Sequence, residues 1–566
     1  MAQGSSLHHP FCLPQHWTLD NYRGSLMKAQ GKAKPTGIVW PSGSTGDIVK
    51  SALAASVAGV DDDTASEVAS EKQWRKSYMP HLVRHVEACL TSSDAAMQIS
   101  KQGLNFLYKE FGFLRDDGQT VTIQEAMSSP KTPCPFQTAV VHGTADLPDK
   151  IGFGSVKVPW SFSLTAGQPL TGLDLEYQLV KAAAQGLMEP SVIDAVRYLN
   201  HDQSWCKELA DTCFVALGGG AAMGPTLDLL ALGATVVAVD IAVPALWDRL
   251  IRSARKLPGT LVFPVKLGTA SDANDEDLAS VAGCNMTADT PEILQWLQAI
   301  YPEKHHVVGM YAYADGADFV RVALAMDAIA AGMVESRPKG QVSIAYMCSP
   351  TDVFGIPVEA REESKRRQTI EGMASMRRRM WQVPLRAAGL GRIMTANNEG
   401  RDEPRTKGRP VVDCLVVQQG PNYAFAKRLQ HWRAMVAQAG GTVVSANVAP
   451  ASHTVSVRKQ KLLAAAYDGS KRFGVEIFNP QTSSALMTAL MLHDIFFPNS
   501  HPSSDHPFGL FMHGAVHGGM WRQPYLLRST VEVAAVIQLA VNYKVPHFIG
   551  ATAATAAATM GLKSRL

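Results

Sequence analysis

The sequence predicts an α/β protein built around a doubly wound parallel sheet. From about residue 212, apolar runs rich in β-branched residues alternate with segments long enough to form helices. Parallel strands joined by helical crossovers require this alternation. A glycine-rich turn also joins the first of these runs to a following helix, as at the first crossover of such a sheet. The expected strands are residues 213–219, 235–241, 305–314, 341–348 and 441–449.

Length and composition predict one large domain with additions. The chain has 566 residues, of which 46% are apolar and 18% are charged, so it can bury a large core. Helical and strand-like stretches are mixed in the first part of the chain, and the last part is apolar with a helical pattern. The expected parts are an α+β N-terminal extension over 1–205, the sheet domain over 206–529 with a basic insert at about 356–411, and a helical tail over 530–566.

The charge balance favours a small-molecule partner. The 53 basic and 50 acidic side chains give a net charge of +3, which offers no electrostatic basis for binding nucleic acid or a membrane surface. No stretch has 18 uninterrupted apolar residues, and the start of the chain lacks the pattern of a signal peptide. The eight cysteines are scattered singly, without the paired spacing of a zinc site. We therefore expect a soluble intracellular protein without membrane insertion, metal or nucleic acid.

The glycine-rich turn predicts a dinucleotide-binding site. Gly218, Gly219 and Gly220 follow an apolar strand, Gly224 precedes a helix, and Asp240 ends the next strand. Glycines allow a tight turn and a close approach of the backbone to a pyrophosphate, whose charge the free N–H groups at the helix start attract. A carboxylate about twenty residues later can bind the adenosine ribose hydroxyls. These features are typical of a Rossmann fold, and the acid favours NAD over NADP because a 2′-phosphate would meet like charge.

The spacing of the glycines, GxGxxxG, resembles that of the short-chain dehydrogenase/reductase family. Tyr423 and Lys427 form the YxxxK pair of this family. Ser349 follows the run that corresponds to the family's fifth strand, and Ser343 is the second choice for the family's serine. The basic insert separates serine and tyrosine much further than is usual. The resemblance covers roughly residues 212–525.

The resemblance implies an NAD(P)-dependent oxidoreductase that interconverts an alcohol and a carbonyl compound, as a homo-oligomer. Tyr423 would serve as acid or base, Lys427 would tune it and hold the ribose, and Ser349 would position the substrate oxygen. Residues 283–300 correspond to the family's third strand and its crossover helix, with Asn285 or Asp289 near the adenine, and residues 511–519 correspond to its last strand. The cofactor-binding set comprises Gly218, Gly219, Gly220, Met223, Gly224, Asp240, Ala314, Gly316, Lys427 and Pro450. Ala314, Asp315 and Gly316 depart from the family's NNAG pattern.

The YxxxK pair also makes physical sense on its own. Tyr423 and Lys427 lie four residues apart in a helical pattern and so share a face. The ammonium is expected to lower the pKa of the phenol, which would allow proton exchange with a substrate hydroxyl. The same spacing occurs by chance, as in Tyr177 and Lys181, which precede the glycine turn and are expected to be a surface pair.

Two alternatives and a location complete the sequence interpretation. A nucleotide-binding scaffold that keeps the fold without turnover would explain the altered NNAG region and the displaced serine. A separate catalytic module in residues 1–205 is a further possibility. The final residues Ser564, Arg565 and Leu566 resemble the peroxisomal address SKL, which an import receptor reads. We expect a peroxisomal location, with a lipid-derived hydroxyacyl or oxoacyl substrate, and a cytoplasmic location if this match is accidental.

Overall fold

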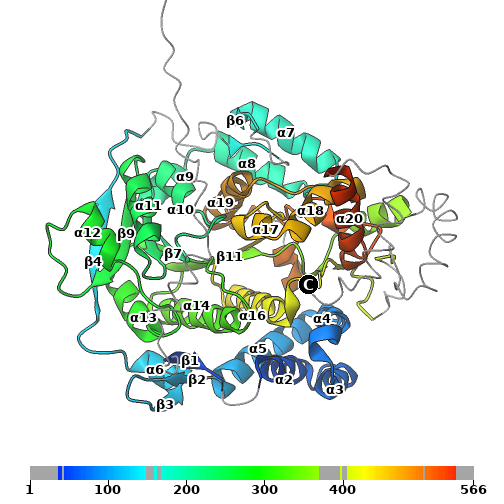
Figure 1. The fold of residues 1–566 in the computed structure, drawn as a ribbon, viewed down its shortest axis with the longest axis horizontal. Helices are drawn as coiled ribbons and strands as arrows, with labels where there is room; N and C mark the ends of the chain where they lie inside the picture. The colour runs from blue at the N-terminus through cyan, green and yellow to red at the C-terminus, as the bar shows by residue number, and fades with distance from the viewer. Residues whose placement is uncertain are drawn as a thin grey trace, which may run out of the picture.

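The computed structural model describes residues 36–40, 44–147, 158–161, 167–368, 395–397, 405–500 and 504–542. Figure 1 shows a central sheet with helices on both sides. The α/β class with a largely parallel sheet is therefore confirmed.

Among the described residues, the central sheet has seven strands. The first six strands in its order are parallel to one another, and the seventh pairs antiparallel with the sixth. The order across the sheet is β14 (Val444–Val448), β11 (Val342–Cys348), β10 (His305–Met310), β7 (Thr212–Leu217), β8 (Thr235–Val239), β9 (Thr260–Lys266) and β4 (Phe136–His142). The five predicted strands are thus present, and the sheet gains β9 and β4. The strand expected near residue 283 is wrong, because β9 takes that position in the sheet and residues 283–289 form turns before a helix.

Two hydrophobic cores lie on opposite faces of this sheet. Along β7, Cys213, Val215 and Leu217 belong to one core, whereas Phe214 and Ala216 belong to the other, as the twofold alternation of a strand requires. The first core contacts α13 (Thr290–Ala299), α14 (Ala317–Ser336) and α16 (Gly420–Ala439). The second core contacts α10 (Thr226–Ala231), α11 (Pro244–Arg255), α12 (Asp275–Val281) and α19 (Pro480–Phe496).

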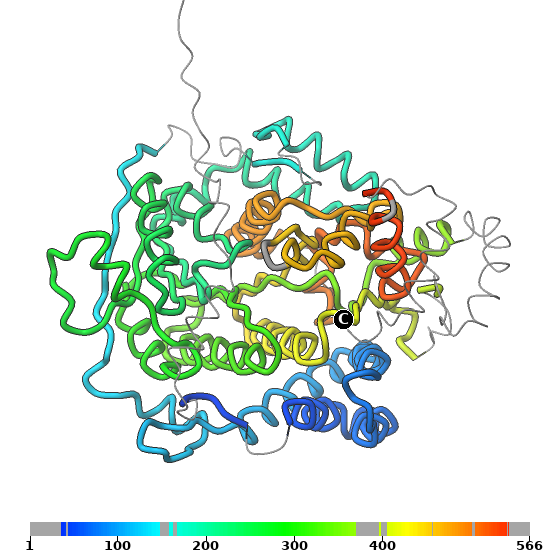
Figure 2. Tube along the Cα trace, in the orientation of Figure 1, coloured from blue at the N-terminus to red at the C-terminus, as the bar shows by residue number. Residues whose placement is uncertain are grey.

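The described residues among the first 205 are distributed over both faces and one edge of the sheet. Figure 2 shows the first helices (blue) beside α16 and the later ones (cyan) beside α19. Gly103 marks the first contact, because a Cβ there would lie 2.5 Å from the ring of Trp432 on α16. The group near α16 comprises α2 (Thr45–Val57), α3 (Asp62–Ser70), α4 (Trp74–Leu90), α5 (Ser93–Glu110), α6 (Ile123–Ser128) and the small sheet of β1 (Gly37–Val39), β2 (Gly112–Leu114) and β3 (Thr120–Thr122). The group near α19 comprises α7 (Gly172–Ala184), α8 (Ser191–His201), β5 (Val158–Pro159) and β6 (Pro169–Leu170), and α9 (Trp205–Ala210) follows it in sequence.

The predicted basic insert begins and ends in a two-stranded ladder. β12 (Val353–Gly355) pairs antiparallel with β13 (Val411–Asp413). Residues 358–368 are helical, whereas residues 369–394 and 398–404 lie outside the described residues. The ladder therefore brings the two ends of the insert together.

The last part of the chain is helical as far as it is described. α18 (Lys461–Ser470), which follows α17 (Val455–Lys459), shares a small apolar cluster with α20 (Val531–Asn542). The expected last strand at 511–519 is wrong, because these residues form turns and make one backbone bond to β14, from the amide of Val516 to the carbonyl of Val448. The rest of the predicted tail, including the terminal Ser564, Arg565 and Leu566, lies outside the described residues. Among the helices described, none is both long and apolar enough to cross a bilayer.

Candidate functional site

The glycine turn packs closely against the ends of two neighbouring strands. Gly218 has a φ of +100°, and a Cβ on it would lie 2.3 Å from the amide nitrogen of Ala312 after β10. A Cβ on Gly219 would lie 2.6 Å from that of Ala238 in β8. Only glycine fits both positions, because the turn lies where the ends of β7, β8 and β10 meet.

Asp240 faces the turn from the end of β8. Its carboxylate accepts hydrogen bonds from the amides of Gly220 at 2.7 Å and Ile241 at 2.8 Å. Burial raises the pKa of this carboxyl, whereas the two amides and the guanidinium of Arg249 act in the opposite direction. Arg249 also donates to the carbonyl of Gly220 at 3.1 Å. Each carboxylate oxygen retains a lone pair for a further donor.

Donors for an anion remain at this turn. In the part of the chain that the structure covers, the amides of Ala222 and Met223 have no hydrogen-bond acceptor. The hydroxyl of Thr226, the first residue of α10, is buried and has no partner among the described residues. Gly224 ends the turn with a bond from its amide to the carbonyl of Ala221 at 3.0 Å. The buried hydroxyl of Thr226 lacks an acceptor, which is costly, so these groups fit a phosphate-bearing ligand better than an apolar one.

The other predicted cofactor residues lie at the same edge of the sheet. Ala314 and Gly316 follow β10, and Gly316 has a φ of +59° at the start of α14. Pro450 is buried just after β14. The amide of Cys284, beside Asn285, donates to the carbonyl of Asp240 at 2.9 Å, so the turn that contains Asn285 lies next to the predicted ribose acid.

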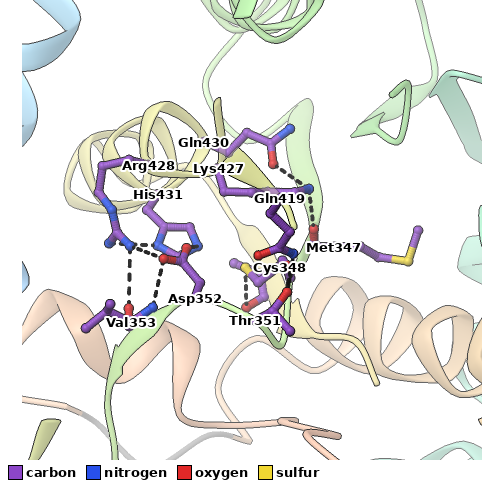
Figure 3. Close-up of polar contacts among 12 residues, drawn as sticks. Met347, Cys348, Thr351, Asp352, Val353, Gln419, Lys427, Arg428, Gln430 and His431 are labelled. Carbon is purple, nitrogen blue, oxygen red and sulfur yellow. Dashed lines mark hydrogen bonds and ion pairs between the residues drawn. The ribbon is translucent and has the colours of Figure 1, made fainter. Parts of the chain in front are cut away.

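The three predicted catalytic residues come together despite their separation in sequence. Ser349 follows β11, and its side chain is near enough to Tyr423 on α16 to lower the pKa of that phenol. One turn further along α16, Lys427 donates to the carbonyl of Met347 and to the side chain of Gln430, each at 3.0 Å (Figure 3). Ser349, Tyr423 and Lys427 therefore form one group at the carboxyl end of the sheet.

The pKa of Tyr423 differs from the sequence expectation. Burial raises the pKa of this phenol well above its ordinary value, and the hydrogen bond with Ser349 opposes that increase. Burial lowers the pKa of Lys427, with Cys348 and Asp352 acting in the opposite direction. The expectation that the ammonium lowers the pKa of Tyr423 is therefore wrong for this structure.

Aromatic side chains border the phenol. The ring of Tyr313 meets that of Tyr423 edge-on at 6.0 Å between centroids, and the ring of Phe319 lies at 5.3 Å. The ammonium of Lys427 lies 5.8 Å from the centroid of Phe319. Tyr313 is 59% exposed, so this aromatic border reaches the surface.

Two polar residues that the sequence interpretation missed contact Ser349. The hydroxyl of Thr351 lies 2.9 Å from that of Ser349. The side-chain amide of Gln419 donates to Thr351 and, at 3.4 Å, to Ser349 (Figure 3). Neither residue has a motif spacing that would identify it, because the two lie on opposite sides of the insert in sequence.

A buried ion pair connects the loop of Ser349 to the helix of Tyr423. Arg428 on α16 donates to Asp352 at 2.7 Å, with the two side chains only 1% and 2% exposed. Burial raises the pKa of Asp352, and Arg428 opposes this increase. His431 lies beside both, at 3.2 Å from Arg428 (Figure 3). The pair fixes the position of α16 relative to the end of β11.

Some residues weighed in the sequence lie elsewhere. Ser343 is at the amino end of β11, where its hydroxyl is 2.9 Å from His305, so it cannot replace Ser349. Tyr177 and Lys181 are exposed on α7, as expected of a surface pair. Asp289 caps its own turn by accepting the amide of Asn285 at 2.8 Å.

No protein-family model and no curated protein matches this chain.

Proposed function

We propose that the chain is an NAD(P)-dependent oxidoreductase of the short-chain dehydrogenase/reductase type, built on a Rossmann fold. The strand order supports this fold, because β9, β8, β7, β10, β11 and β14 follow the 3-2-1-4-5-6 order of parallel strands. In such sheets, ligands bind where the order reverses, at the carboxyl ends of the strands. That position lies between β7 and β10, beside Gly218.

One observation carries the proposed activity: Ser349, Tyr423 and Lys427 converge at the edge of the sheet that also holds the glycine turn. A bound nicotinamide would supply the hydride acceptor or donor. Tyr423 would exchange a proton with the substrate oxygen, and Ser349 would orient that oxygen. Lys427 would hold the ribose beside Tyr423.

The coenzyme would be held mainly by backbone groups of the turn. The amides of Ala222 and Met223 and the hydroxyl of Thr226 would bind the diphosphate. Asp240 would accept the ribose hydroxyls, which favours NAD. Arg249 beside it offsets part of the negative charge, so we propose NAD with residual NADP binding.

A nucleotide-binding scaffold is the second candidate, and the raised pKa of Tyr423 favours it. A phenol that stays protonated cannot accept the proton of the substrate hydroxyl, so turnover in the oxidative direction would be slow. A peroxisomal location and a lipid-derived substrate remain predictions from residues 564–566.

The test compares Tyr423→Phe with a matched control. NADH binding is measured by tryptophan fluorescence, and NADH oxidation is measured with a panel of carbonyl compounds. The oxidoreductase predicts that Tyr423→Phe lowers turnover about 1,000-fold with unchanged NADH affinity. The control, Tyr177→Phe, removes the hydroxyl of the exposed tyrosine in the second YxxxK sequence and should change neither quantity. Binding without turnover in the unmodified chain would establish the scaffold, and failure to bind either coenzyme would exclude both candidates.

A further inference from the structure

The outer face of α7 carries an exposed row of apolar side chains. Leu173 is 73% exposed and Tyr177 is 67% exposed, and within the described ranges these are the two most exposed large apolar side chains. Val180 and Ala184 are also exposed and continue the row. Figure 1 shows α7 at the rim of the molecule. A contiguous exposed apolar surface of this kind is typical of a binding site for another protein surface.

The inner face of α7 is apolar as well. Leu175, Leu179 and Ala182 are buried in the second core. A helix with apolar side chains on opposite faces is normally covered on both of them. A partner therefore explains the outer row better than solvent does.

The spacing of the outer row fits a helical partner. Leu173, Tyr177, Val180 and Ala184 follow one another at intervals of four, three and four residues. This spacing keeps one side of a helix in contact with a second helix along its whole length. An extended segment that lay across α7 would not require it.

The charges beside the row favour a second copy of the same helix. Asp174 and Lys181 are exposed, lie on the same side of the row and are seven residues apart. This separation of about 10 Å along the helix is too large for the two to pair with each other. Within the described part of the chain, neither of them forms an ion pair. Each charge is therefore free to pair across an interface.

Only one direction of the partner helix brings these charges together. In an antiparallel pair related by a twofold axis, the charged sides of both copies lie on the same side of the interface, so that each Asp174 meets a Lys181. In a parallel pair, the two charged sides would point in opposite directions and no ion pair would form. A twofold pair also needs one surface patch only, because both copies use the same one.

We propose that α7 is a dimer interface, in which two copies of this chain pack antiparallel about a twofold axis close to Tyr177. Asp174 of each copy pairs with Lys181 of the partner subunit, and the apolar rows of the two helices pack between these pairs. This inference goes beyond the proposed function and does not depend on it. It assigns a surface to the homo-oligomer that the sequence predicts.

The size of the face sets the expected strength of the dimer. α7 has 13 residues and is therefore about 20 Å long. A single helix face of this length is smaller than a standard protein interface. We expect a reversible dimer with a dissociation constant of about 1 to 100 µM.

The first test measures this dissociation constant by sedimentation velocity of the full chain over a series of concentrations that spans the expected range. Leu173→Lys places a charge in the apolar row and should raise the dissociation constant at least about tenfold. Leu267→Lys is the matched control, because Leu267 is also exposed, at 56%, but follows β9. It should leave the dissociation constant unchanged.

The second test exchanges the charges and so identifies the partner. Asp174→Lys and Lys181→Asp each place like charges opposite one another at two symmetry-related positions and should weaken the dimer about fivefold. The double variant restores both pairs with reversed signs and should regain the original dissociation constant. This recovery requires that the partner carries the same two substitutions, as only a second copy does.

Three results would overturn the proposal. A chain that is monomeric at every concentration would mean that another segment of the chain or another protein covers α7. A dimer that Leu173→Lys does not weaken would have its interface elsewhere, and a double charge variant as weak as the single ones would exclude the antiparallel pair. If Leu173→Lys does not fold, judged by circular dichroism, the charge variants decide. Since none of these measurements uses NADH, their outcome does not affect the proposed function.

Discussion

The glycine turn and the hydroxyl cluster of Ser349 and Tyr423 lie at the same edge of the sheet but are built in different ways. The turn is continuous in sequence and depends on backbone geometry, since Gly218 and Gly219 are required by the neighbouring strand ends. The cluster is assembled from two segments on either side of the insert, and side chains hold it together. Local spacing can therefore predict the turn, whereas the cluster depends on tertiary contacts.

Removing the buried ion pair beside the cluster should cause the largest loss of unfolding free energy. Arg428→Met leaves the carboxylate of Asp352 buried without its cation, which costs about 4 kcal/mol of unfolding free energy. Arg252→Met is the matched control, because Arg252 pairs with Asp248 at 2.6 Å on the surface, with 73% and 40% exposure. This exposed pair contributes less than about 1 kcal/mol. Urea unfolding measures both, and equal losses would contradict the role given to Arg428.

The turn should instead be sensitive to substitutions of its glycines, because these change the backbone. Gly218→Ala combines a positive φ with a Cβ 2.3 Å from the nitrogen of Ala312 and should cost between about 3 and 4 kcal/mol. Gly340→Ala separates the two causes, because Gly340 has a φ of +89° and open space around its Cβ position. Gly340→Ala should lower the free energy of unfolding by about 1 kcal/mol. Similar losses in thermal unfolding would mean that the close approach to Ala312 contributes nothing.

The sheet illustrates how far sequence patterns lead. The α/β class and five of the strands follow from alternating apolar runs, because buried parallel strands need that composition. β9 was missed because it contains Pro264, which normally argues against a strand. The structure tolerates this proline because the pairing of β8 with β9 ends at Val262. β4 lies at an edge and comes from far earlier in the chain, so no local pattern connects it to the sheet.

The candidate site also contains residues that the sequence could predict and residues that it could not. Gly218, Gly220 and Asp240 were predictable because each has a fixed place in one continuous segment. Thr351 and Gln419 were not predictable from the sequence. Only the ladder at the base of the insert brings their side chains into contact with Ser349. The pKa of Tyr423 was also beyond the sequence, because burial determines its direction.

A buried carboxyl behind the turn should make the stability of this region depend on pH. Burial raises the pKa of Asp228 to about 6, against hydrogen bonds from Ser484 and Thr488. The unfolded chain loses this proton near pH 4, whereas the folded chain keeps it until about pH 6. The free energy of unfolding is therefore lowest above pH 6, where it is about 3 kcal/mol smaller than below pH 4.

Asp228→Asn removes this titration and keeps an acceptor for Ser484. Its free energy of unfolding should exceed that of the unmodified chain by up to about 3 kcal/mol at pH 7, and the difference should disappear as pH falls to about 4. Asp94→Asn, at an exposed carboxyl in the first turn of α5, should show no such gain. A gain from Asp228→Asn that is the same at both pH values would show that Asp228 does not titrate in this window.

The smallest expected effect is on coenzyme affinity, and it distinguishes the glycine turn from the hydroxyl cluster. Asp240→Ala removes the carboxylate that faces the turn and should weaken NADH binding about tenfold, which corresponds to about 1.4 kcal/mol. Asp248→Ala removes an exposed carboxylate from α11 and should leave the affinity unchanged. Because Tyr423→Phe should act on turnover and not on affinity, the two substitutions together assign binding to the turn and chemistry to the cluster. Unchanged affinity in Asp240→Ala would mean that the acid only holds Gly220, so that the turn would owe its sequence to packing rather than to a coenzyme.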